Sequence, residues 1–416
     1  MMSNYSANVS AAMWLLLTDS PPVNMTDDLV NGTNSSLTEQ PEVETEMWRN
    51  VVRPPFWSKV LVAVVLSFIA LCGILGNGAV IRIVWCNKSM RNIPNIFITS
   101  LAMADLLVLV SCVPITIANY FLPAWVFGNI PCKLMPFIQF TSIGVSIFTL
   151  TAMSHDRYRA IVKPMSIQAN HALRRTNLVT VLIWVLSMAL ATPDLVLSYV
   201  DEIHRVLSVT DPDGNAMIVN LNYKICRPTP PSYQPLYGQI ATMAQFSVLY
   251  CLPLTTIGVF YVMIARNLVQ SSRNIPTANK SMIRQLEARK NVAKTVLILV
   301  GIFALCWLPV HIVNMWRWFS WANSPVPPPP LDMFAAMVVS QGLMYSNSCV
   351  NPLALFLLSK SFRTFFYRYL FCCCRRRADI RRAYEGSTMR TLQFTVIRRA
   401  NTMSRTDTAM TAMTVI

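Results

Sequence analysis

The residue most suited to chemistry is an acid inside an apolar stretch, Asp105 in "SLAMADLLVLV". An ionisable side chain in such surroundings is costly and usually marks a functional site. Candidate partners lie in other apolar stretches, namely Asn77, Ser146, Asn347 and Asn351. Carboxylate, hydroxyl and amide oxygens are hard ligands, which suit a small cation such as Na⁺. A hydrogen-bonded polar cluster without an ion, or a proton relay, would use the same residues.

A second charged feature is "DRY", Asp156-Arg157-Tyr158, at the end of another long apolar stretch. These charges would either mark where a membrane span meets water or form a working ion pair. Arg157 follows Cys132 by 25 residues, which is about 37 Å of helix at 1.5 Å per residue. One helix would therefore carry Cys132 and the charge pair on opposite membrane faces.

A third group of residues surrounds a proline. In "FALCWLP", Phe303 and Trp307 precede Pro309, which removes a backbone donor and bends its helix. Trp307 would act as a pivot that couples the bend to the position of its ring, or it would simply pack beside the kink. His311 follows within the same stretch and has no partners for a metal site. It would belong to a ligand pocket or be a hydrogen-bonded core residue.

These residues sit on unusually apolar elements. Hydrophobic residues make up 54% of the 416 residues and charged residues 13%, whereas about 25% of residues are charged in soluble domains. A membrane-spanning helix needs roughly 20 apolar residues. The sequence therefore predicts an all-α membrane protein, a bundle of seven transmembrane helices near 59–85, 95–121, 133–154, 177–199, 239–264, 293–319 and 333–359.

The distribution of charge predicts the orientation of this bundle. The first 48 residues contain seven acids and no lysine or arginine, whereas basic residues gather in alternate loops and in the C-terminal tail. This is the positive-inside pattern, so we expect an extracellular N-terminus and a cytoplasmic C-terminus. The net charge of +16 therefore indicates membrane topology rather than a nucleic-acid partner.

Eleven cysteines are present, and elimination leaves one extracellular pair. Only Cys132 and Cys226 fall outside the spans on the oxidising side, so we predict a disulfide between them rather than two free thiols. It would hold the long loop over 200–237 across the outer mouth of the bundle. Within that loop, "DPDG" at 211–214 is a turn signal that would close a β-hairpin.

The composition divides the chain into four parts. Residues 1–58 read as a disordered, glycosylated extracellular arm, with N-x-Ser/Thr acceptor sites at Asn4, Asn8, Asn24, Asn31 and Asn34. Residues 59–359 are expected to form the seven-helix bundle, and 375–416 a disordered cytoplasmic tail. Residues 360–374 read as a short amphipathic eighth helix along the inner leaflet. Three cysteines end it and are either palmitoylated or unmodified: Cys372, Cys373 and Cys374.

Taken together, these motifs resemble the rhodopsin-like (class A) G-protein-coupled receptors over about 60–374. The resemblance rests, in chain order, on Asn77, "SLAMAD", Cys132, "DRY", Trp184, Pro253 with Tyr261, "FALCWLP" and "NSCVNP". Longer runs such as "ARKNVAKTVLILVGIFALCWLPVHIV" are similar to the bombesin receptors and to their invertebrate relatives, the CCHamide receptors. Endothelin receptors are more distant, and an endothelin-like peptide is the alternative ligand.

The resemblance implies that a neuropeptide binds between the outer halves of the spans. The positions that match the family's pocket are Gln139, His311, Asn314, Arg317 and Gln341. Arg317 would meet a carbonyl-rich or acidic end of the peptide, or extend to the membrane interface. Gln341 stands where the vertebrate bombesin receptors have arginine, which favours a CCHamide-like ligand.

The resemblance also implies a switch that ends at a heterotrimeric G protein, of the Gq type in this branch. A change at Trp307 would pass to its neighbours Phe303, Ile147 and Pro253 and would bend the helix at Pro309. At the inner end, the residues that would then contact the G protein are Asp156, Arg157, Tyr158 and Tyr261. Na⁺ would act as an allosteric ion at Asp105, and arrestin would bind a phosphorylated tail. One departure is Leu355, because the superfamily usually has tyrosine there.

Two other classes of protein fit the sequence poorly. A transporter usually has two repeated halves, and seven spans without a visible repeat do not divide in this way. An enzyme would need a nucleophile, a base and an acid that converge, which the apolar stretches do not supply. We therefore expect a plasma-membrane receptor without catalytic activity.

Overall fold

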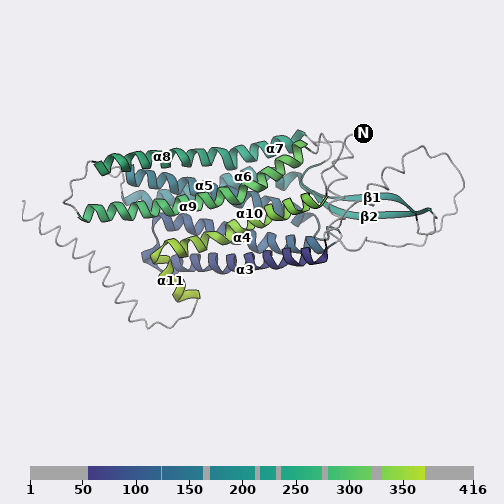
Figure 1. The fold of residues 1–416 in the computed structure, drawn as a ribbon, viewed down its shortest axis with the longest axis horizontal. Helices are drawn as coiled ribbons and strands as arrows, with labels where there is room; N and C mark the ends of the chain where they lie inside the picture. Colours follow the sequence, from purple (N-terminus) through teal and green to yellow (C-terminus); the bar gives the residue numbers. More distant parts are fainter. Residues whose placement is uncertain are drawn as a thin grey trace, which may run out of the picture. The chain divides into compact units, whose positions relative to one another are not determined.

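The computed structural model describes residues 55–122, 124–162, 169–210, 216–230, 236–273, 280–320 and 330–370. Over the part that ends at Phe362, long helices run side by side, and a β-hairpin projects from one end (Figure 1). The first half contributes α3 (Phe56–Cys86), η1 (Lys88–Met90), α4 (Ile93–Phe121), α5 (Asn129–Val162) and α6 (Ala169–Leu197). The second half contributes α7 (Leu236–Phe246), η4 (Ser247–Cys251), α8 (Leu252–Arg273), α9 (Lys280–Met315), η5 (Trp316–Ser320) and α10 (Pro330–Leu358).

Six of the described helical stretches are long and apolar enough to cross a membrane: α3, α4, α5, α6, α7 with α8, and α9 with η5. The seventh predicted span corresponds to α10, which packs against α9, α3 and α4. Its sequence includes Gln341, Asn347 and Asn351, which lower its hydropathy. Its hydropathy is lower because several of its polar side chains are buried inside the bundle.

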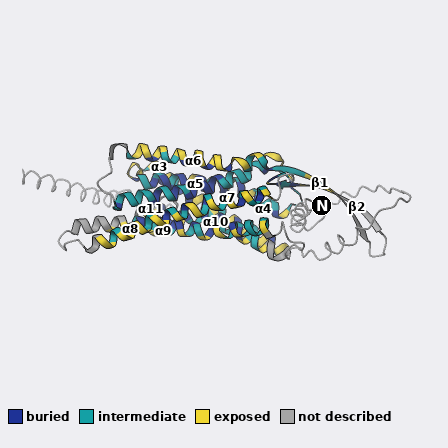
Figure 2. Ribbon diagram, turned by 90° about the horizontal axis from the view of Figure 1, so that it is seen from above, coloured by how far each residue is buried: buried dark blue, intermediate teal, exposed yellow. Residues whose placement is uncertain are grey.

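Burial separates central helices from those that face lipid. In the most apolar window of α4, 61% of residues are buried, compared with 17% in α6. The outer surface is apolar, as shown by Phe68, Leu75 and Val181, which are all more than half exposed. Figure 2 shows this pattern, with buried residues inside the bundle and exposed residues along α6. Since lipid replaces water around a membrane helix, apolar side chains on that face are favourable.

The helices are longer than the apolar runs that predicted them. Helix α5 extends from Asn129 to Val162, so "DRY" lies within the helix and not beyond its end. Helix α6 begins at Ala169 and ends at Leu197, and Tyr199, predicted as the last residue of that span, begins a strand. The apolar run marks the part of a helix that lies in lipid. The helix itself can extend beyond that part into water, because its backbone hydrogen bonds do not depend on apolar side chains.

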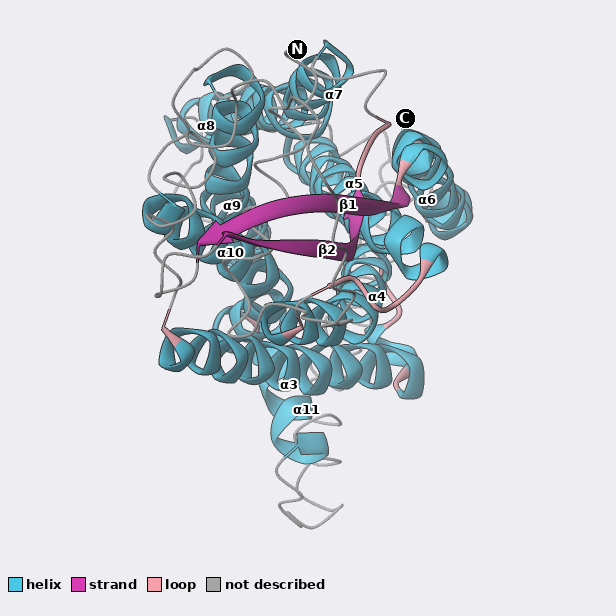
Figure 3. Cartoon of the chain, turned by 90° about the vertical axis from the view of Figure 1, so that its right-hand side faces the viewer, coloured by secondary structure: helices cyan, strands magenta, loops and turns pink. Residues whose placement is uncertain are grey.

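The loop between α6 and α7 contains the expected hairpin. Strands β1 (Tyr199–Thr210) and β2 (Ala216–Arg227) pair antiparallel, from Tyr199 opposite Arg227 to Thr210 opposite Ala216. The predicted turn, 211–214, lies outside the described residues. Seen from the hairpin end, both strands cross in front of the ring of helices (Figure 3).

Helix α11 (Lys360–Leu370) is the predicted eighth helix. Phe362 and Phe366 are buried, whereas Arg363, Thr364 and Tyr367 are exposed, as the amphipathic pattern predicts. The five glycosylation sites and Cys372–Cys374 lie outside the described residues, so these modifications stay predictions.

Candidate functional site

A cavity of about 360 Å³ lies between the outer halves of the helices. Helices α4, α5, α7, α9 and α10, together with η5, contribute its lining. All five predicted ligand residues line it: Gln139, His311, Asn314, Arg317 and Gln341. Among the described residues of the lining, Arg317 is the one lysine or arginine, and there is no aspartate or glutamate. The cavity is thus neutral to cationic.

Two hydrogen-bonded contacts join α4 to α10 along one wall of the cavity. The Tyr120 hydroxyl donates to Gln341 Oε1 over 2.7 Å, and the Thr116 and Tyr345 hydroxyls lie 2.8 Å apart. Gln139 Nε2 of α5 donates to the Tyr345 hydroxyl over 3.0 Å. The sequence analysis missed the two tyrosines and Thr116, although their spacing of four residues on each helix could have indicated a shared face.

The floor of the cavity contains Trp307, whose ring centroid lies 6.0 Å from that of Phe303. Phe303, Trp307 and Ile147 are all buried. The indole Nε1 of Trp307 has no hydrogen-bond partner among the described residues. A buried donor without a partner is costly, and this one lines the cavity, where a ligand would be able to reach it.

His311 packs against two aromatic rings that stack on each other. Its ring centroid is 5.4 Å from that of Phe246 and 5.1 Å from that of Tyr250. The π-helix η4 contains Tyr250, whose hydroxyl donates to the carbonyl of Ala304 over 3.1 Å. His311 Nε2 has no hydrogen-bond partner in the described chain. Single turns of π-helix often occur at functional sites, and here the turn helps to enclose the pocket histidine.

Arg317 is supported at the rim by the neighbouring residue. Its guanidinium carbon lies 5.4 Å from the ring centroid of Trp318, a cation–π distance. The Trp318 ring covers Gly238 so closely that a Cβ added there would lie 2.3 Å from it. Gln239 Nε2 donates to the Trp318 carbonyl over 3.1 Å. The outer ends of α7 and η5 are therefore fitted to each other.

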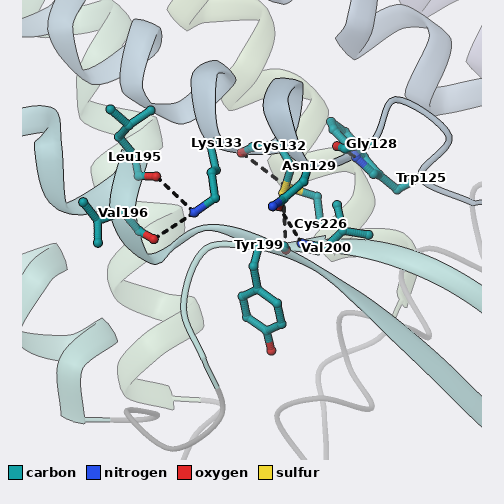
Figure 4. The surroundings of a disulfide bond; sticks show 10 residues. All are labelled: Trp125, Gly128, Asn129, Cys132, Lys133, Leu195, Val196, Tyr199, Val200 and Cys226. Atoms are coloured by element: carbon teal, nitrogen blue, oxygen red, sulfur yellow. Dashed lines mark hydrogen bonds between the residues drawn. A yellow bond between two sulfur atoms is a disulfide. The ribbon is translucent and has the colours of Figure 1, made fainter.

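The predicted disulfide, Cys132–Cys226, is present, with the two Cα atoms 5.6 Å apart (Figure 4). It joins the start of α5 to β2. Close to it, Lys133 Nζ donates to the carbonyl of Val196 at the end of α6, over 2.9 Å. Asn129 Oδ1 accepts from the backbone N–H of Val200. The disulfide and the Asn129 contact hold the base of the hairpin against α5, and the Lys133 contact joins α5 to α6.

A small core lies beneath the hairpin. Trp125 packs with Cys132, Tyr223 and Ile225, and its backbone N–H donates to the carbonyl of Lys224 over 2.8 Å. The hairpin is therefore bound to the loop that follows α4 as well as to α5.

Two ion pairs cross the hairpin, Asp201 with Arg227 and Glu202 with Lys224. The Arg227 side chain is buried, whereas Glu202 and Lys224 are exposed. The hydrogen bond from Lys224 Nζ, over 2.7 Å, holds the pKa of the Glu202 carboxyl below its ordinary value. Because that pair faces water, its contribution to stability is small.

Asp105 is fully buried among polar groups. Its Oδ2 accepts from Asn351 Nδ2 over 2.9 Å, and Ser348 also hydrogen-bonds to the carboxyl group. Asn77 Nδ2 donates to the carbonyl of Ser348 over 2.8 Å. Oδ1 of Asp105 has no partner among the described residues. The sequence analysis missed Ser348, which lies next to the predicted Asn347.

The two other predicted members of this polar set are also buried, Ser146 at 2% exposure and Asn347 at 3%. Carboxylate and hydroxyl oxygens are the donors that Na⁺ prefers. An unpartnered carboxylate oxygen therefore fits a cation site, although the hydrogen bond from Asn351 fits a polar cluster equally well.

At the inner end, Arg157 forms an ion pair with Asp156, its neighbour in sequence. The Tyr158 ring stacks on Phe260 of α8, with centroids 5.5 Å apart. The His155 ring lies 5.5 Å from the same Phe260. His155, which the sequence left without a role, thus packs between α5 and α8.

Tyr261 also connects helices at this end, because its hydroxyl donates to the carbonyl of Ala293 on α9 over 2.7 Å. Leu355 is buried and borders a space of about 10 Å³ with Asn77 and Asn351. A leucine at this position has no group that can hydrogen-bond to Tyr261.

Comparison with known proteins places this architecture in a family. Residues 76–355 match the profile of the 7 transmembrane receptor (rhodopsin family). The chain is 41% identical over 352 residues to bombesin receptor subtype-3 of Ovis aries, which covers 84% of each chain. It is also 41% identical over 323 residues to a bombesin receptor of Bombina orientalis, which covers 77% of this chain and 79% of the relative. The chain therefore belongs to the rhodopsin-like (class A) G-protein-coupled receptors, multi-pass proteins of the plasma membrane.

Proposed function

We propose that this receptor binds an extracellular neuropeptide of the bombesin or CCHamide type and transmits the signal to a heterotrimeric G protein. The observation that carries the proposal is the 41% identity to two bombesin receptors over more than three quarters of the chain. The cavity beneath the disulfide-bound hairpin supports it, since the residues expected to contact peptide all line that cavity.

In this proposal the peptide end enters the cavity and contacts Gln139, His311, Asn314, Arg317 and Gln341. The lining favours an uncharged or anionic end, because Arg317 is its one cation and no carboxylate lies there among the described residues. A buried ammonium group would lack a counter-charge. Trp307 Nε1, which has no hydrogen-bond partner in the described part of the chain, offers a further donor at the floor.

The peptide shifts a two-state equilibrium by binding one state more tightly than the other. Trp307, Phe303 and Ile147 would relay its position to Pro253, and α9 would bend at Pro309. The buried contact between Trp307 and Phe303 supports this route. Opening requires α9 to leave Tyr261, whose hydroxyl bonds to Ala293.

At the inner end, Arg157 would leave Asp156 and meet the G protein, with Tyr158 and Tyr261 beside it. The basic inner loops suit an acidic protein surface and anionic lipid. We propose a Gq-type partner by similarity to the bombesin branch. Arrestin would bind after phosphorylation of the tail, and Cys372–Cys374 would carry palmitate.

The Asp105 site would hold Na⁺ in the resting receptor. Its Oδ1 has no hydrogen-bond partner among the residues that the structure describes, which supports this. Ser146, Asn347 and Asn351 are the nearby polar residues. When bound, the ion would neutralise the carboxylate. Loss of the ion would accompany the rearrangement of α9 and α10.

Calcium release in cells that express the receptor tests the proposal. Bombesin, CCHamide-like peptides and an endothelin would be applied in turn, with untransfected cells as the control. We expect a saturable response to a bombesin- or CCHamide-type peptide that a Gq inhibitor abolishes. A response to the endothelin alone, or to no peptide while surface expression is normal, would overturn the assignment of the ligand.

A further inference from the structure

The hydroxyl of Tyr261 lies where three helices meet at the inner end of the bundle. It donates to the carbonyl of Ala293 on α9 over 2.7 Å, and the Ser154 hydroxyl of α5 lies within hydrogen-bond reach of it. Ser154 has 0% exposure, so only neighbouring groups inside the bundle can reach its oxygen. Ser154 and Tyr261 therefore face each other across the contact between α5 and α8.

In the resting arrangement, each of these two hydroxyls directs its proton away from the other. A hydroxyl has one proton and two lone pairs. The Tyr261 proton goes to Ala293, and the Ser154 proton goes to the carbonyl of Leu150 over 2.8 Å. The Ser154 oxygen keeps lone pairs that can accept a hydrogen bond, so it can receive the Tyr261 proton if the contact with α9 is broken.

Apolar packing decides which helix Tyr261 stays with when α9 moves. An apolar cluster at this end consists of Ile161 of α5, Ile264 of α8 and Ala293 of α9. The rings of Tyr158 and Tyr261 pack against this cluster. Among the described residues of the cluster, α9 contributes Ala293 alone, whereas α5 and α8 contribute the larger side chains. An outward movement of α9 therefore leaves Tyr261 beside α5.

The residue at position 355 cannot take over the freed hydroxyl. Leu355 on α10 is 4% exposed and has no polar atom in its side chain. It borders the same small space as Met153, which precedes Ser154 on α5. The tyrosine that the superfamily usually has at this position would offer a hydroxyl to Tyr261, so this chain needs another acceptor.

We infer that Ser154 is a positioning residue that accepts the hydrogen bond of the Tyr261 hydroxyl once α9 has moved, in place of the tyrosine missing at position 355. This inference rests on the proposed function, since it concerns how the same receptor reaches its G protein. Without such an acceptor, movement of α9 would leave a buried donor unpaired, which opposes the movement.

The consequence reaches Arg157. Its guanidinium already interacts electrostatically with Tyr261. When the Tyr261 proton turns to Ser154, the phenol oxygen is free to accept from Arg157 after this arginine leaves Asp156. Ser154 thus acts through Tyr261 to hold Arg157 where the G protein meets it.

The test compares Ser154→Ala with Thr151→Ala in the full-length receptor at equal surface expression. Thr151 lies on the same helix, and its hydroxyl donates to the carbonyl of Ile147 over 2.8 Å, so both variants lose the same kind of bond to the preceding turn. Bombesin potency for calcium release should fall about three- to tenfold in Ser154→Ala, as loss of one buried hydrogen bond predicts. In Thr151→Ala the potency should stay within about twofold.

Bombesin affinity for receptor kept uncoupled by excess GTPγS is the second readout. It should be unchanged in both variants, because Ser154 acts only after α9 has moved. Ser154→Thr keeps the hydroxyl, so it should keep the potency of the unmodified receptor.

Two double variants separate positioning from support of the fold. Adding Leu355→Tyr to Ser154→Ala returns a hydroxyl to Tyr261, so potency should recover to within about twofold of the unmodified receptor. Tyr261→Phe has no hydroxyl to place, so adding Ser154→Ala to it should cause no further loss. A serine that only packs α5 would give neither result.

Four results would overturn the inference. One is an equal loss of potency in Ser154→Ala and Thr151→Ala. A second is a loss from Ser154→Ala that persists in Tyr261→Phe. A third is a parallel loss of affinity in the uncoupled receptor, which would show a structural role only. The fourth is a failure of Leu355→Tyr to restore potency.

Basal nucleotide exchange keeps this inference separate from the choice of ligand. GTPγS binding to Gq is measured with purified receptor and no peptide. Ser154→Ala should lower the basal rate about threefold, and Leu355→Tyr should restore it. If bombesin gives no response on the unmodified receptor, the proposed ligand fails, and the basal rates decide this inference. Equal basal rates in Ser154→Ala and the unmodified receptor would then overturn it.

Discussion

At the scale of single residues, two charged sites lead to predictions: the ion pair of Asp156 with Arg157, and the buried Asp105. Arg157 and Asp156 form an ion pair whose side chains are 13% and 26% exposed. A pair in this position is only partly screened by water. It holds Arg157 away from the G-protein surface that we propose it meets.

The first prediction concerns this pair. Asp156→Asn removes the charge that holds Arg157, which we expect to destabilise the resting state by about 1 kcal/mol and raise basal signalling roughly fivefold. Inositol phosphate accumulation without peptide measures it. Glu202→Gln breaks the exposed hairpin pair instead and should leave basal signalling unchanged. A basal level in Asp156→Asn equal to that of the unmodified receptor would contradict a restraining role.

The second prediction concerns Asp105. Because Oδ1 lacks a hydrogen-bond partner among the described residues, we expect a bound Na⁺ to stabilise the resting state and weaken peptide binding. Asp105→Asn removes the charge, so peptide affinity should no longer depend on sodium. Competition binding in sodium and in N-methylglucamine buffers, at equal ionic strength, measures this dependence. A sodium effect that persists in the variant would favour the polar cluster without an ion.

At the scale of elements, the hairpin depends on its attachment to α5. The disulfide closes a loop with a sequence separation of 94, and removal of such a bridge typically costs about 2–4 kcal/mol. The core around Trp125 and Tyr223, with the hydrogen bond from Val200 to Asn129, would then hold the hairpin.

The third prediction follows from this attachment. Cys226→Ser should lower peptide affinity at the cell surface at least tenfold, because the hairpin would no longer be fixed across the cavity. Radioligand binding on intact cells measures it, normalised to surface receptor. Cys251→Ser, which removes a free and exposed thiol, is the control. Normal affinity in Cys226→Ser would show that the smaller core suffices.

A second pair of elements, α7 and η5, supports Arg317. Trp318 covers Gly238, and a Cβ there would lie 2.3 Å from its ring. Such an approach forces one element to shift, since side chains in a packed contact cannot overlap.

The fourth prediction is therefore that Gly238→Ala lowers peptide potency by about tenfold or more, as Trp318 and the adjacent Arg317 are displaced. Gly258→Ala is the matched control, because nothing lies within 4 Å of the Cβ it adds. Dose–response curves for calcium release compare the two. Equal potency in both variants would mean that the contact between α7 and η5 does not position Arg317.

At the scale of the whole helical bundle, activation requires α9 to move relative to the helices around it. The bond from Tyr261 to Ala293 opposes this movement at the inner end, and Pro309 lies within α9. A helix bends most easily at such a proline because one backbone hydrogen bond is missing.

The fifth prediction measures this movement. Spin labels at Arg174 of α6 and Lys290 of α9, both exposed, should separate by several ångströms when peptide and G protein bind. Double electron–electron resonance on a receptor in which the exposed Cys86 and Cys251 are replaced gives the distance. Labels at Arg174 and Arg82 serve as the comparison within the first half of the bundle. An unchanged distance between α6 and α9 would refute the bending of α9.

Much of this protein follows from its sequence alone. The length of the apolar runs predicts the spans, because lipid requires apolar side chains and complete backbone hydrogen bonding. The placement of bases predicts the orientation, and elimination predicted the bond between Cys132 and Cys226, which the structure confirms. The family was also correctly identified, since its motifs are short, local and ordered along the chain.

Other features were decided only when the helices packed. The sequence placed Cys132 and "DRY" on one helix, as α5 confirms, but it could not show that His155 packs on Phe260. The pairing of Tyr120 with Gln341 joins residues 221 positions apart, and the fit of Trp318 on Gly238 depends on the rotation of two elements. Such contacts depend on how helices face one another, and a single sequence records the composition of each helix but not the angle at which it meets its neighbour.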